Sequence, residues 1–301
     1  MKHVSVEKKA MLAALIAYSI FGLSYLFSKM AMDVADPIML LAVRFSVTVI
    51  VLNLLVLLRA QKLTLKGKNL FGPILLGILQ PVLYFLLENY GLKYTTTSFT
   101  GLISAISPVF AALLGVVILK EKPNFKQWIC ITISIAGVML VSVGTSAGEN
   151  TWAGCICLLS AYLIGSLYSV FLRHLSKTYS AFELTYIMFH VGFLFFAGLV
   201  FMQNGKNTLP MIVSALSDGR FLAAILYLGA AASVGAYLMA NYATCHLPVS
   251  RSTIFSCFAT VVSVLSGVFI MNDPFTVTSG IAMILILVGV YGVNRFAPKD
   301  M

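Results

Sequence analysis

The sequence predicts an all-α membrane protein in which ten transmembrane helices form two inverted repeats of five. Three observations carry this prediction. Hydrophobic residues make up 60% of the 301 residues and charged residues only 10%, whereas a soluble domain carries about a quarter charged residues. The apolar residues fall into ten long runs, and one stretch of the first half returns in the second half at a fixed offset.

Each apolar run is long enough to cross a bilayer, because a spanning helix needs roughly 20 apolar residues. Short polar loops separate the runs, and nothing between them is long enough for a soluble domain. We therefore expect the lipid bilayer to surround the whole chain. The predicted spans are residues 10–30, 38–58, 70–91, 95–119, 126–144, 152–172, 181–202, 221–243, 248–271 and 276–295.

The stretch 88–123 is the part of the first half that returns most clearly. It matches 240–274 at an offset of 152 positions, so that Asn89 falls on Asn241. Several matches at one offset indicate an internal duplication.

The duplication divides the chain into two predicted domains. We expect the first repeat in residues 1–145 and the second in 151–301, with 146–150 as the polar linker between them.

Lysine and arginine are distributed unequally between the two sets of loops. If the N-terminus is cytoplasmic, 14 of the 20 lie in inside loops and only four in outside loops. Positive charge collects on the cytoplasmic side, so we expect both termini inside a multi-pass plasma-membrane protein. Five spans per repeat is an odd number, which makes the repeats inverted relative to each other. Inverted repeats can exchange roles across the membrane in alternating access.

Two charged residues are predicted to lie inside the membrane at one depth. Arg44 is about six residues from the outer end of the second span, and Glu88 is about as far from the outer end of the third. At 1.5 Å per residue, both lie roughly 9 Å below the outer surface. A charge in hydrocarbon costs at least ~2.5–3.5 kcal/mol, so we expect the two to pair. The pair either locks two helices together or faces a cavity, where it meets a charged substrate or a proton.

Four further residues complete the predicted site. Gln80, in the third span with Tyr84, and Ser107, in the fourth, each precede a proline. Irregular backbone at this depth is tolerated where it faces protein or a wet cavity, and a simple kink is the alternative. His190, in the seventh span, either titrates near neutral pH or packs through hydrogen bonds. The predicted substrate-binding residues are Arg44, Gln80, Tyr84, Glu88, Ser107 and His190, with Glu88 and His190 as candidates for proton coupling.

Pairs of small residues recur at matching positions of the fourth and ninth spans. They are Ala111 with Gly115 and Ser263 with Gly267. Small residues four apart let helices approach closely. We therefore expect these spans to pack near each other at the pseudo-symmetry axis of the two repeats; the alternative is that the pairs face lipid by chance.

Motifs for nucleotide or metal chemistry are absent from the sequence, which contains no P-loop, no HExxH and no GxGxxG. We therefore predict no cofactor, no metal site and no ATP engine. The positive charges lie in loops between apolar runs, so we expect no nucleic-acid partner. The oligomeric state is left open between monomer and homodimer.

Several motifs are spread over nearly the whole chain. They are the aromatic-Gly-Ser start at Phe21 to Tyr25 with Lys29, Pro37 with Arg44, the run from Tyr90 to Thr95, and then Ser98, Pro108 and Glu121. On these motifs the chain resembles the EamA type of the drug/metabolite transporter superfamily over nearly its whole length. The second repeat departs from the pattern, because Thr260 stands where the first has Pro108, Asp273 stands where the first has Glu121, and no residue there matches Arg44.

The resemblance implies a carrier for small organic metabolites, amino-acid-like or amphiphilic, often an exporter, with a central cavity. One rival hypothesis is a polytopic membrane enzyme acting on a lipid-linked substrate. An enzyme needs a converging set of acid, base or metal, and the intramembrane Glu, Arg and His are scattered over three spans, so we expect no enzyme. The other rival is a passive facilitator of the same fold.

Overall fold

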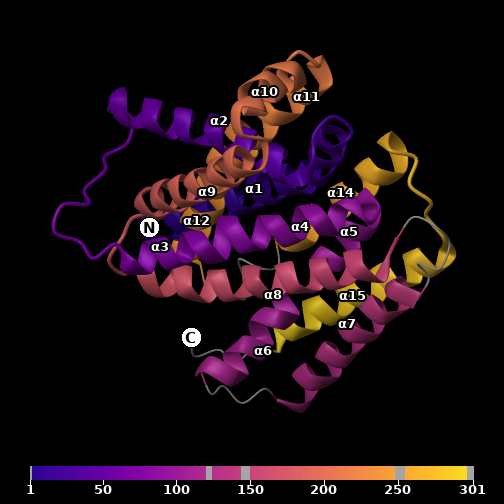
Figure 1. The fold of residues 1–301 in the computed structure, drawn as a ribbon. Helices are drawn as coiled ribbons and strands as arrows, with labels where there is room; N and C mark the ends of the chain where they lie inside the picture. The colour runs from indigo at the N-terminus through magenta and orange to yellow at the C-terminus, as the bar shows by residue number, and fades with distance from the viewer. Residues whose placement is uncertain (1, 120–123, 144–149, 248–254, 297–301) are drawn as a thin grey trace.

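The computed structural model describes residues 2–119, 124–143, 150–247 and 255–296. Every regular element in these ranges is a helix (Figure 1). The first half contains α1 (Lys2–Met32), α2 (Pro37–Leu57), α3 (Phe71–Gly77), η1 (Ile78–Leu83), α4 (Tyr84–Lys93), α5 (Thr97–Ser104), α6 (Ser107–Leu119) and α7 (Phe125–Val143). The second half contains α8 (Trp152–Leu175), α9 (Ala181–Asn204), η3 (Gly205–Asn207), α10 (Thr208–Leu216), α11 (Gly219–Leu226), η4 (Tyr227–Ala236), α12 (Tyr237–His246), α14 (Ser256–Ile270) and α15 (Val277–Arg295).

The helices confirm the predicted all-α membrane fold. Seven helices of the described ranges are long and apolar enough to cross a membrane. Three shorter apolar helices, at 125–140, 258–270 and 277–293, stand at the remaining predicted spans. An apolar helix therefore stands at each of the ten predicted positions.

The loop chemistry explains where several helices begin. Asp36 caps α2 by accepting from the backbone N–H groups of the next turn, and Pro37 occupies the first helical position. Ser180 and Glu183 form a reciprocal capping box at the start of α9. These signals are readable in the sequence, and the predicted starts of these two helices, residues 38 and 181, agree with the observed starts at Pro37 and Ala181.

Three features of the backbone depart from ten plain spans. The third and eighth spans each contain a π-helical segment, η1 and η4, at equivalent positions of the two halves. The fourth span is interrupted between Ser104 and Ser107. A short helix, α10, extends the seventh span beyond its predicted end. Each half thus keeps the irregular turn of its third helix, although the sequences of the two turns differ.

The principal contacts are arranged symmetrically between the halves. The first helix of the first half, α1, packs against α11, η4 and α12 of the second half. Its counterpart α8, the first helix of the second half, packs against α3, η1 and α4 of the first half. The pairs α2 with α9, α5 with α14 and α7 with α15 join equivalent helices, and Figure 1 shows α7 beside α15 and α4 beside α8. Exchanging the two halves leaves this pattern of contacts unchanged, which is expected for an internal duplication.

The helix α1 runs antiparallel to the eighth span. Ala10 and Ala14 of α1 pack with Ala243 of α12, while further along α1 the carbonyl of Ile20 accepts a hydrogen bond from the Tyr227 hydroxyl. The N-terminal end of α1 therefore lies at the C-terminal end of α12, and this direction orients the cavity described below.

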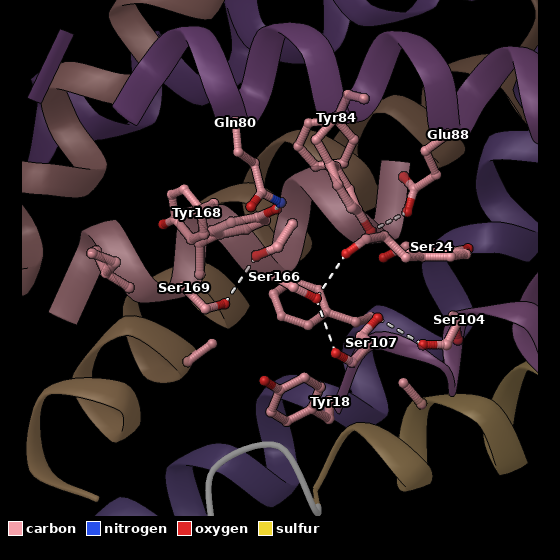
Figure 2. Close-up of a pocket in the computed structure, with 18 of the residues that line it drawn as sticks. Tyr18, Ser24, Gln80, Tyr84, Glu88, Ser104, Ser107, Ser166, Tyr168 and Ser169 are labelled. Carbon is pink, nitrogen blue, oxygen red and sulfur yellow. Dashed lines mark hydrogen bonds between the residues drawn. The ribbon is translucent and has the colours of Figure 1, made fainter. Parts of the chain in front are cut away.

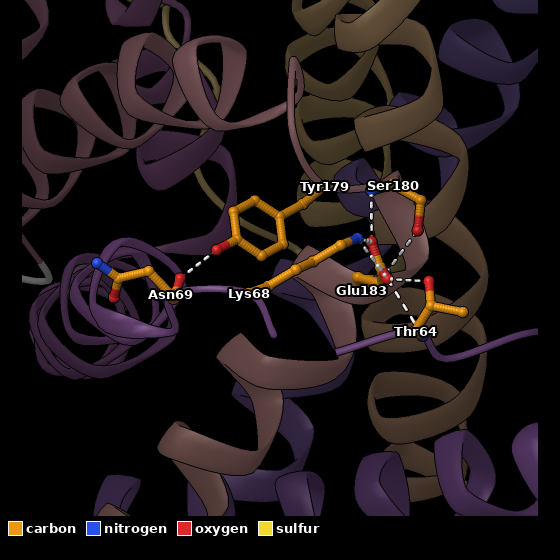
Figure 3. Close-up of polar contacts among 6 residues, drawn as sticks. All are labelled: Thr64, Lys68, Asn69, Tyr179, Ser180 and Glu183. Carbon is orange, nitrogen blue, oxygen red and sulfur yellow. Dashed lines mark hydrogen bonds and ion pairs between the residues drawn. The ribbon is translucent and has the colours of Figure 1, made fainter. Parts of the chain in front are cut away.

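A polar clasp ties the loop after α2 to the start of α9 (Figure 3). Glu183, whose side chain is 2% exposed, forms an ion pair of 2.8 Å with Lys68 and accepts from the Thr64 hydroxyl at 2.7 Å. The Tyr179 hydroxyl also donates to the carbonyl of Asn69. The clasp joins the first half to the second at the end where α2 ends and α9 begins.

Candidate functional site

A cavity lies between the two halves (Figure 2). Its walls come from α1, α2, the third span, the fourth span, α8, α12 and α14. Six tyrosines line it: Tyr18, Tyr25, Tyr84, Tyr162, Tyr168 and Tyr237. Five serines line it as well: Ser24, Ser104, Ser107, Ser166 and Ser169. Among the described lining residues, the ionisable side chains other than tyrosine are Arg44 and Glu88, and both come from the first half.

Arg44 is held in place from both halves of the protein. Its Nε donates a hydrogen bond of 2.9 Å to the Ser233 hydroxyl in η4. The guanidinium lies over the ring of Phe85, 4.3 Å from the centroid, a cation–π contact that fixes its plane. The side chain is 2% exposed, so packing and one hydrogen bond determine where its remaining N–H groups point.

Glu88 lies one turn beyond Phe85 on α4. Its Oε1 accepts a hydrogen bond of 2.5 Å from the Tyr84 hydroxyl one turn earlier on the same helix (Figure 2). Such a bond to a carboxylate is charge-assisted and stronger than one between neutral groups. The carboxyl group is thus oriented by a neutral donor and still lines the cavity.

The middle of the cavity carries a network that joins the third, sixth, seventh and eighth spans. The Gln80 amide donates to the Tyr237 hydroxyl. The Tyr168 hydroxyl donates to the Asn241 Oδ1 at 3.1 Å, and the Asn241 amide donates to the Thr185 hydroxyl at 2.8 Å. Buried polar groups need such partners, and here they come from helices of both halves.

Serine hydroxyls donate hydrogen bonds to the backbone carbonyls at the break in the fourth span. Pro108 has no N–H, so the carbonyl of Ser104 loses its helical donor. The Ser107 hydroxyl replaces it with a hydrogen bond of 2.8 Å to that carbonyl. The Ser166 hydroxyl of α8 donates to the Ser107 carbonyl at 2.9 Å. The predicted irregular backbone at Ser107 therefore lies at the cavity and is not a simple kink facing lipid.

The predicted direct pair between Arg44 and Glu88 is wrong. Within the described residues, the ion pair with N–O contact below 4.0 Å is the one between Lys68 and Glu183. Equal depth on consecutive helices did bring Arg44 and Glu88 to one cavity. It did not bring a nitrogen of Arg44 within 4.0 Å of an oxygen of Glu88.

The structure places His190 outside the cavity. One ring nitrogen lies 2.7 Å from the Tyr186 carbonyl and the other 3.3 Å from the Asn53 amide. The ring also stacks on Tyr186 at 4.1 Å. The five other predicted site residues, Arg44, Gln80, Tyr84, Glu88 and Ser107, all line the cavity.

The predicted packing of the fourth and ninth spans is half right. These spans meet closely through Ser263 and Gly267, but their partners are in α5, where the Ser263 hydroxyl donates to the Thr97 carbonyl. A Cβ at position 101 would collide with the Ser263 side chain, so the close approach requires Gly101. Ala111 instead lines the cavity, and α6, which carries Ala111 and Gly115, packs mainly against α8. The break at Ser104 turns α6 away from α14.

The cavity is closed at the C-terminal end of α1. There the Lys29 ammonium donates to the carbonyls of Leu92 at 2.9 Å and Thr95 at 2.6 Å, and the Thr96 N–H donates to Asn150 at 2.7 Å. At the opposite end the lining continues to Thr244, two residues before α12 ends. Arg44 and Glu88 therefore lie toward the closed end.

Sequence reasoning missed most of the cavity wall, including the tyrosines of α1, α8 and α12 and the serine that holds Arg44. One signal was available: Tyr18 and Tyr162 both lie near the middle of the first predicted span of their repeat. Two tyrosines at equivalent depth indicate a shared lining. Nothing in the sequence marks Ser233.

Comparisons with known proteins agree with this architecture. The model of the EamA-like transporter family matches residues 8–143 and again residues 152–295. An uncharacterized transporter, YcxC, of Bacillus subtilis (strain 168) is 29% identical, with 96% of this chain and 93% of the relative aligned. An uncharacterized transporter of Archaeoglobus fulgidus is 23% identical over 96% of this chain and 99% of that protein.

Two further matches cover less of the chain or share less sequence identity. A probable terminal-alkyne amino-acid exporter of Streptantibioticus cattleyicolor is 26% identical over 56% of this chain and 54% of its own length. A solved crystal structure superposes with a TM-score of 0.69 at 18% identity, covering 97% of this chain and 99% of that one, which supports the fold alone. With both halves matched by one family model, the chain belongs to the EamA-like transporters of the drug/metabolite transporter superfamily, multi-pass membrane proteins that carry small molecules.

Proposed function

We propose that the protein is a secondary transporter that exports a small polar or amphiphilic organic metabolite by alternating access around the central cavity. The observation that carries the proposal is the cavity itself, which lies between the two halves and keeps its two charged residues toward the closed end. A cavity closed at one end is one of the two states that alternating access requires. Because the family is one of transporters, we set the enzyme alternative aside.

The proposed orientation makes the cavity open to the cytoplasm. Both termini are inside in this proposal, so the closed end of the cavity, at the C-terminal end of α1, faces out. An exporter loads its cargo from the cytoplasm, which this state permits. We also propose that residues 1–145 and 151–301 form the two inverted repeats, joined by 146–150, and that the protein resides in the plasma membrane.

Proton coupling is proposed for Glu88. This carboxyl lines the cavity together with Arg44 and six tyrosines, so one group can meet both a proton and the cargo. His190, the other sequence candidate, packs against Tyr186 and Asn53 outside the cavity.

Proteoliposomes test the function directly. We expect them to release a labelled metabolite from a mixed panel, and to do so faster when a pH gradient is imposed. Glu88→Gln should abolish the response to the gradient, whereas His190→Gln should retain it. Release that ignores the gradient in the wild type would favour a passive facilitator, and no release of any panel member would contradict the transporter proposal.

A further inference from the structure

The turn between α4 and α5 is polar and yet almost completely buried. Its residues Thr95, Thr96, Thr97 and Ser98 are between 0% and 6% exposed. Loops normally run over the surface, because their backbone groups need water or another partner. This turn joins two spans that line the cavity, and it lies at the closed end. The contacts that bury it are therefore part of the closure.

A lysine holds the C-terminal end of α4. The Lys29 ammonium donates to the Leu92 carbonyl at 2.9 Å and to the Thr95 carbonyl at 2.6 Å. Carbonyls at the C-terminal end of a helix carry partial negative charge, so a cation is stabilising there. Lys29 belongs to α1, whereas the carbonyls belong to the third span and to the turn that follows it. The contact therefore joins α1 to α4.

An aspartate holds the N-terminal end of α5. The Asp273 Oδ2 accepts a hydrogen bond of 2.6 Å from the Ser98 N–H. The first N–H groups of a helix carry partial positive charge, so an anion is stabilising there. Asp273 follows the end of α14, where Asn272 has a left-handed backbone with φ of 56°, a conformation that asparagine adopts at helix ends. The Asp273 N–H then bonds the Gly267 carbonyl at 3.0 Å, so the end of α14 presents the carboxylate to α5.

The two charged contacts connect helices that must separate if this end opens. The helix α1 packs against α14, whereas α4 packs mainly against α8. The fourth and ninth spans meet at the closed end through α5 and α14, and beyond the break at Ser104 the helix α6 packs against α8 instead. Opening the closed end would part α1 from α4 and α5 from α14. Both charged contacts would then break.

We propose that Lys29 and Asp273 form a latch that keeps this end of the cavity closed, and that both of its contacts break each time the cavity opens there. The inference rests on the proposed alternating access and names residues that set its equilibrium. Neither residue is among the described residues that line the cavity. Both are therefore positioning residues, which act through the turn and not on the cargo.

Cysteine labelling tests the latch on the purified full-length protein in detergent, where both ends of the cavity meet solvent. Thr97→Cys, in a cysteine-free background, reports on the closed end. Thr97 is 0% exposed, and its hydroxyl has no hydrogen-bond partner among the described residues, so the change removes no bond seen there. Thr244→Cys, in the same background, reports on the open end, because Thr244 lines the cavity there.

Neutralising the latch should move the two labelling rates in opposite directions. We expect Lys29→Met and Asp273→Asn each to raise the maleimide labelling rate of Thr97→Cys by about threefold or more, the effect of one charge at a helix end. Each should lower the rate of Thr244→Cys, because alternating access closes one end as the other opens. A turn that is merely loosened, or a protein that is misfolded, would not protect Thr244→Cys.

Two control variants separate the latch from general effects of charge. Lys29→Arg keeps a cation at the end of α4 and should keep both labelling rates. Asp36→Asn is the matched control for the aspartate, because Asp36 caps α2 by accepting from the Ile38 N–H at 2.9 Å. It removes the same charge from another helix N-terminus, and it should leave both rates unchanged.

Two outcomes would overturn the inference. One is a Thr97→Cys labelling rate that neither Lys29→Met nor Asp273→Asn changes. The other is a rise at Thr97→Cys without a fall at Thr244→Cys. If wild-type proteoliposomes release a labelled metabolite in either case, the transport function stands and only the latch is lost. Wild-type proteoliposomes that release nothing would contradict the transport function, whatever the labelling rates.

Discussion

The Arg44 Nε donates to the Ser233 hydroxyl at 2.9 Å. This hydrogen bond joins α2 of the first half to the π-helical segment η4 of the second half. Beside it, the Thr48 hydroxyl lies 3.0 Å from the Gly229 carbonyl and 2.9 Å from that of Arg44. A π-helical turn displaces carbonyls from their usual donors. The irregular turn thus helps to hold Arg44 at the cavity.

Removing the Ser233 hydroxyl should weaken cargo binding more than it weakens the fold. A hydrogen bond to a charged group is worth about 1.5–3 kcal/mol, so we expect Ser233→Ala to raise the apparent KM for a carboxylate cargo by about 10- to 100-fold. Ser46→Ala is the matched control, since that hydroxyl bonds only the Ala42 carbonyl of its own helix. Equal KM values for the two variants in proteoliposomes would contradict a positioning role.

Neutral substitutions of Arg44 and Glu88 should act additively on stability. Breaking a buried ion pair costs about 3–5 kcal/mol, because it leaves one charge uncompensated, and the second neutral change would then restore stability. Without direct contact no such rescue is expected, so the melting-temperature losses of Arg44→Gln and Glu88→Gln should sum in the double variant. Recovery of the melting temperature in the double variant would show that the two charges do pair.

The stability that the polar clasp provides should depend more on the Glu183 carboxylate than on the Lys68 ammonium. Lys68→Met leaves the carboxylate with the Thr64 hydroxyl and the Ser180 N–H as donors. Glu183→Ala removes the acceptor for all of them. We therefore expect Glu183→Ala to lower the melting temperature further than Lys68→Met does, in detergent at one pH. The reverse order would mean that the ion pair alone holds the loop.

Close packing of α5 on α14 predicts opposite effects for two glycine-to-alanine changes. At Gly101 a Cβ would collide with Ser263, whereas at Gly198 it would meet nothing within 4 Å. Alanine is favoured over glycine in a helix by about 1 kcal/mol, so Gly198→Ala should be neutral or stabilising. Gly101→Ala should lower the melting temperature by several degrees. Similar melting temperatures for both variants would argue against close contact at this crossing.

Labelling of single cysteines in a cysteine-free background tests the topology. Lys66, in the loop after α2, and Lys206, in the short helix η3, are both exposed. We expect an impermeant maleimide to label Lys206→Cys on intact cells but Lys66→Cys only after permeabilisation. Asn150, a natural choice in the linker, is unsuitable because its side chain accepts from the Thr96 N–H. The opposite labelling pattern would invert the proposed orientation and place the open end of the cavity outside.

The sequence by itself determined the membrane fold, the ten spans and the depth of the charged residues. Hydropathy sets the spans, because a backbone in lipid must satisfy its polar groups within the helix. The rise of 1.5 Å per residue converts position along a span into depth. That is how Arg44 and Glu88 were placed at one level, and they do line one cavity.

Only the tertiary structure decided which helices are neighbours and which way each side chain turns. Depth along a helix is local, whereas rotation about its axis is set by packing against helices far away in the sequence. His190 has a depth compatible with the site and faces Asn53 instead. Ser233 carries no signal in the sequence, yet packing brings it to Arg44 across 189 positions, because the contacts of η4 with α2 fix both helices at that point.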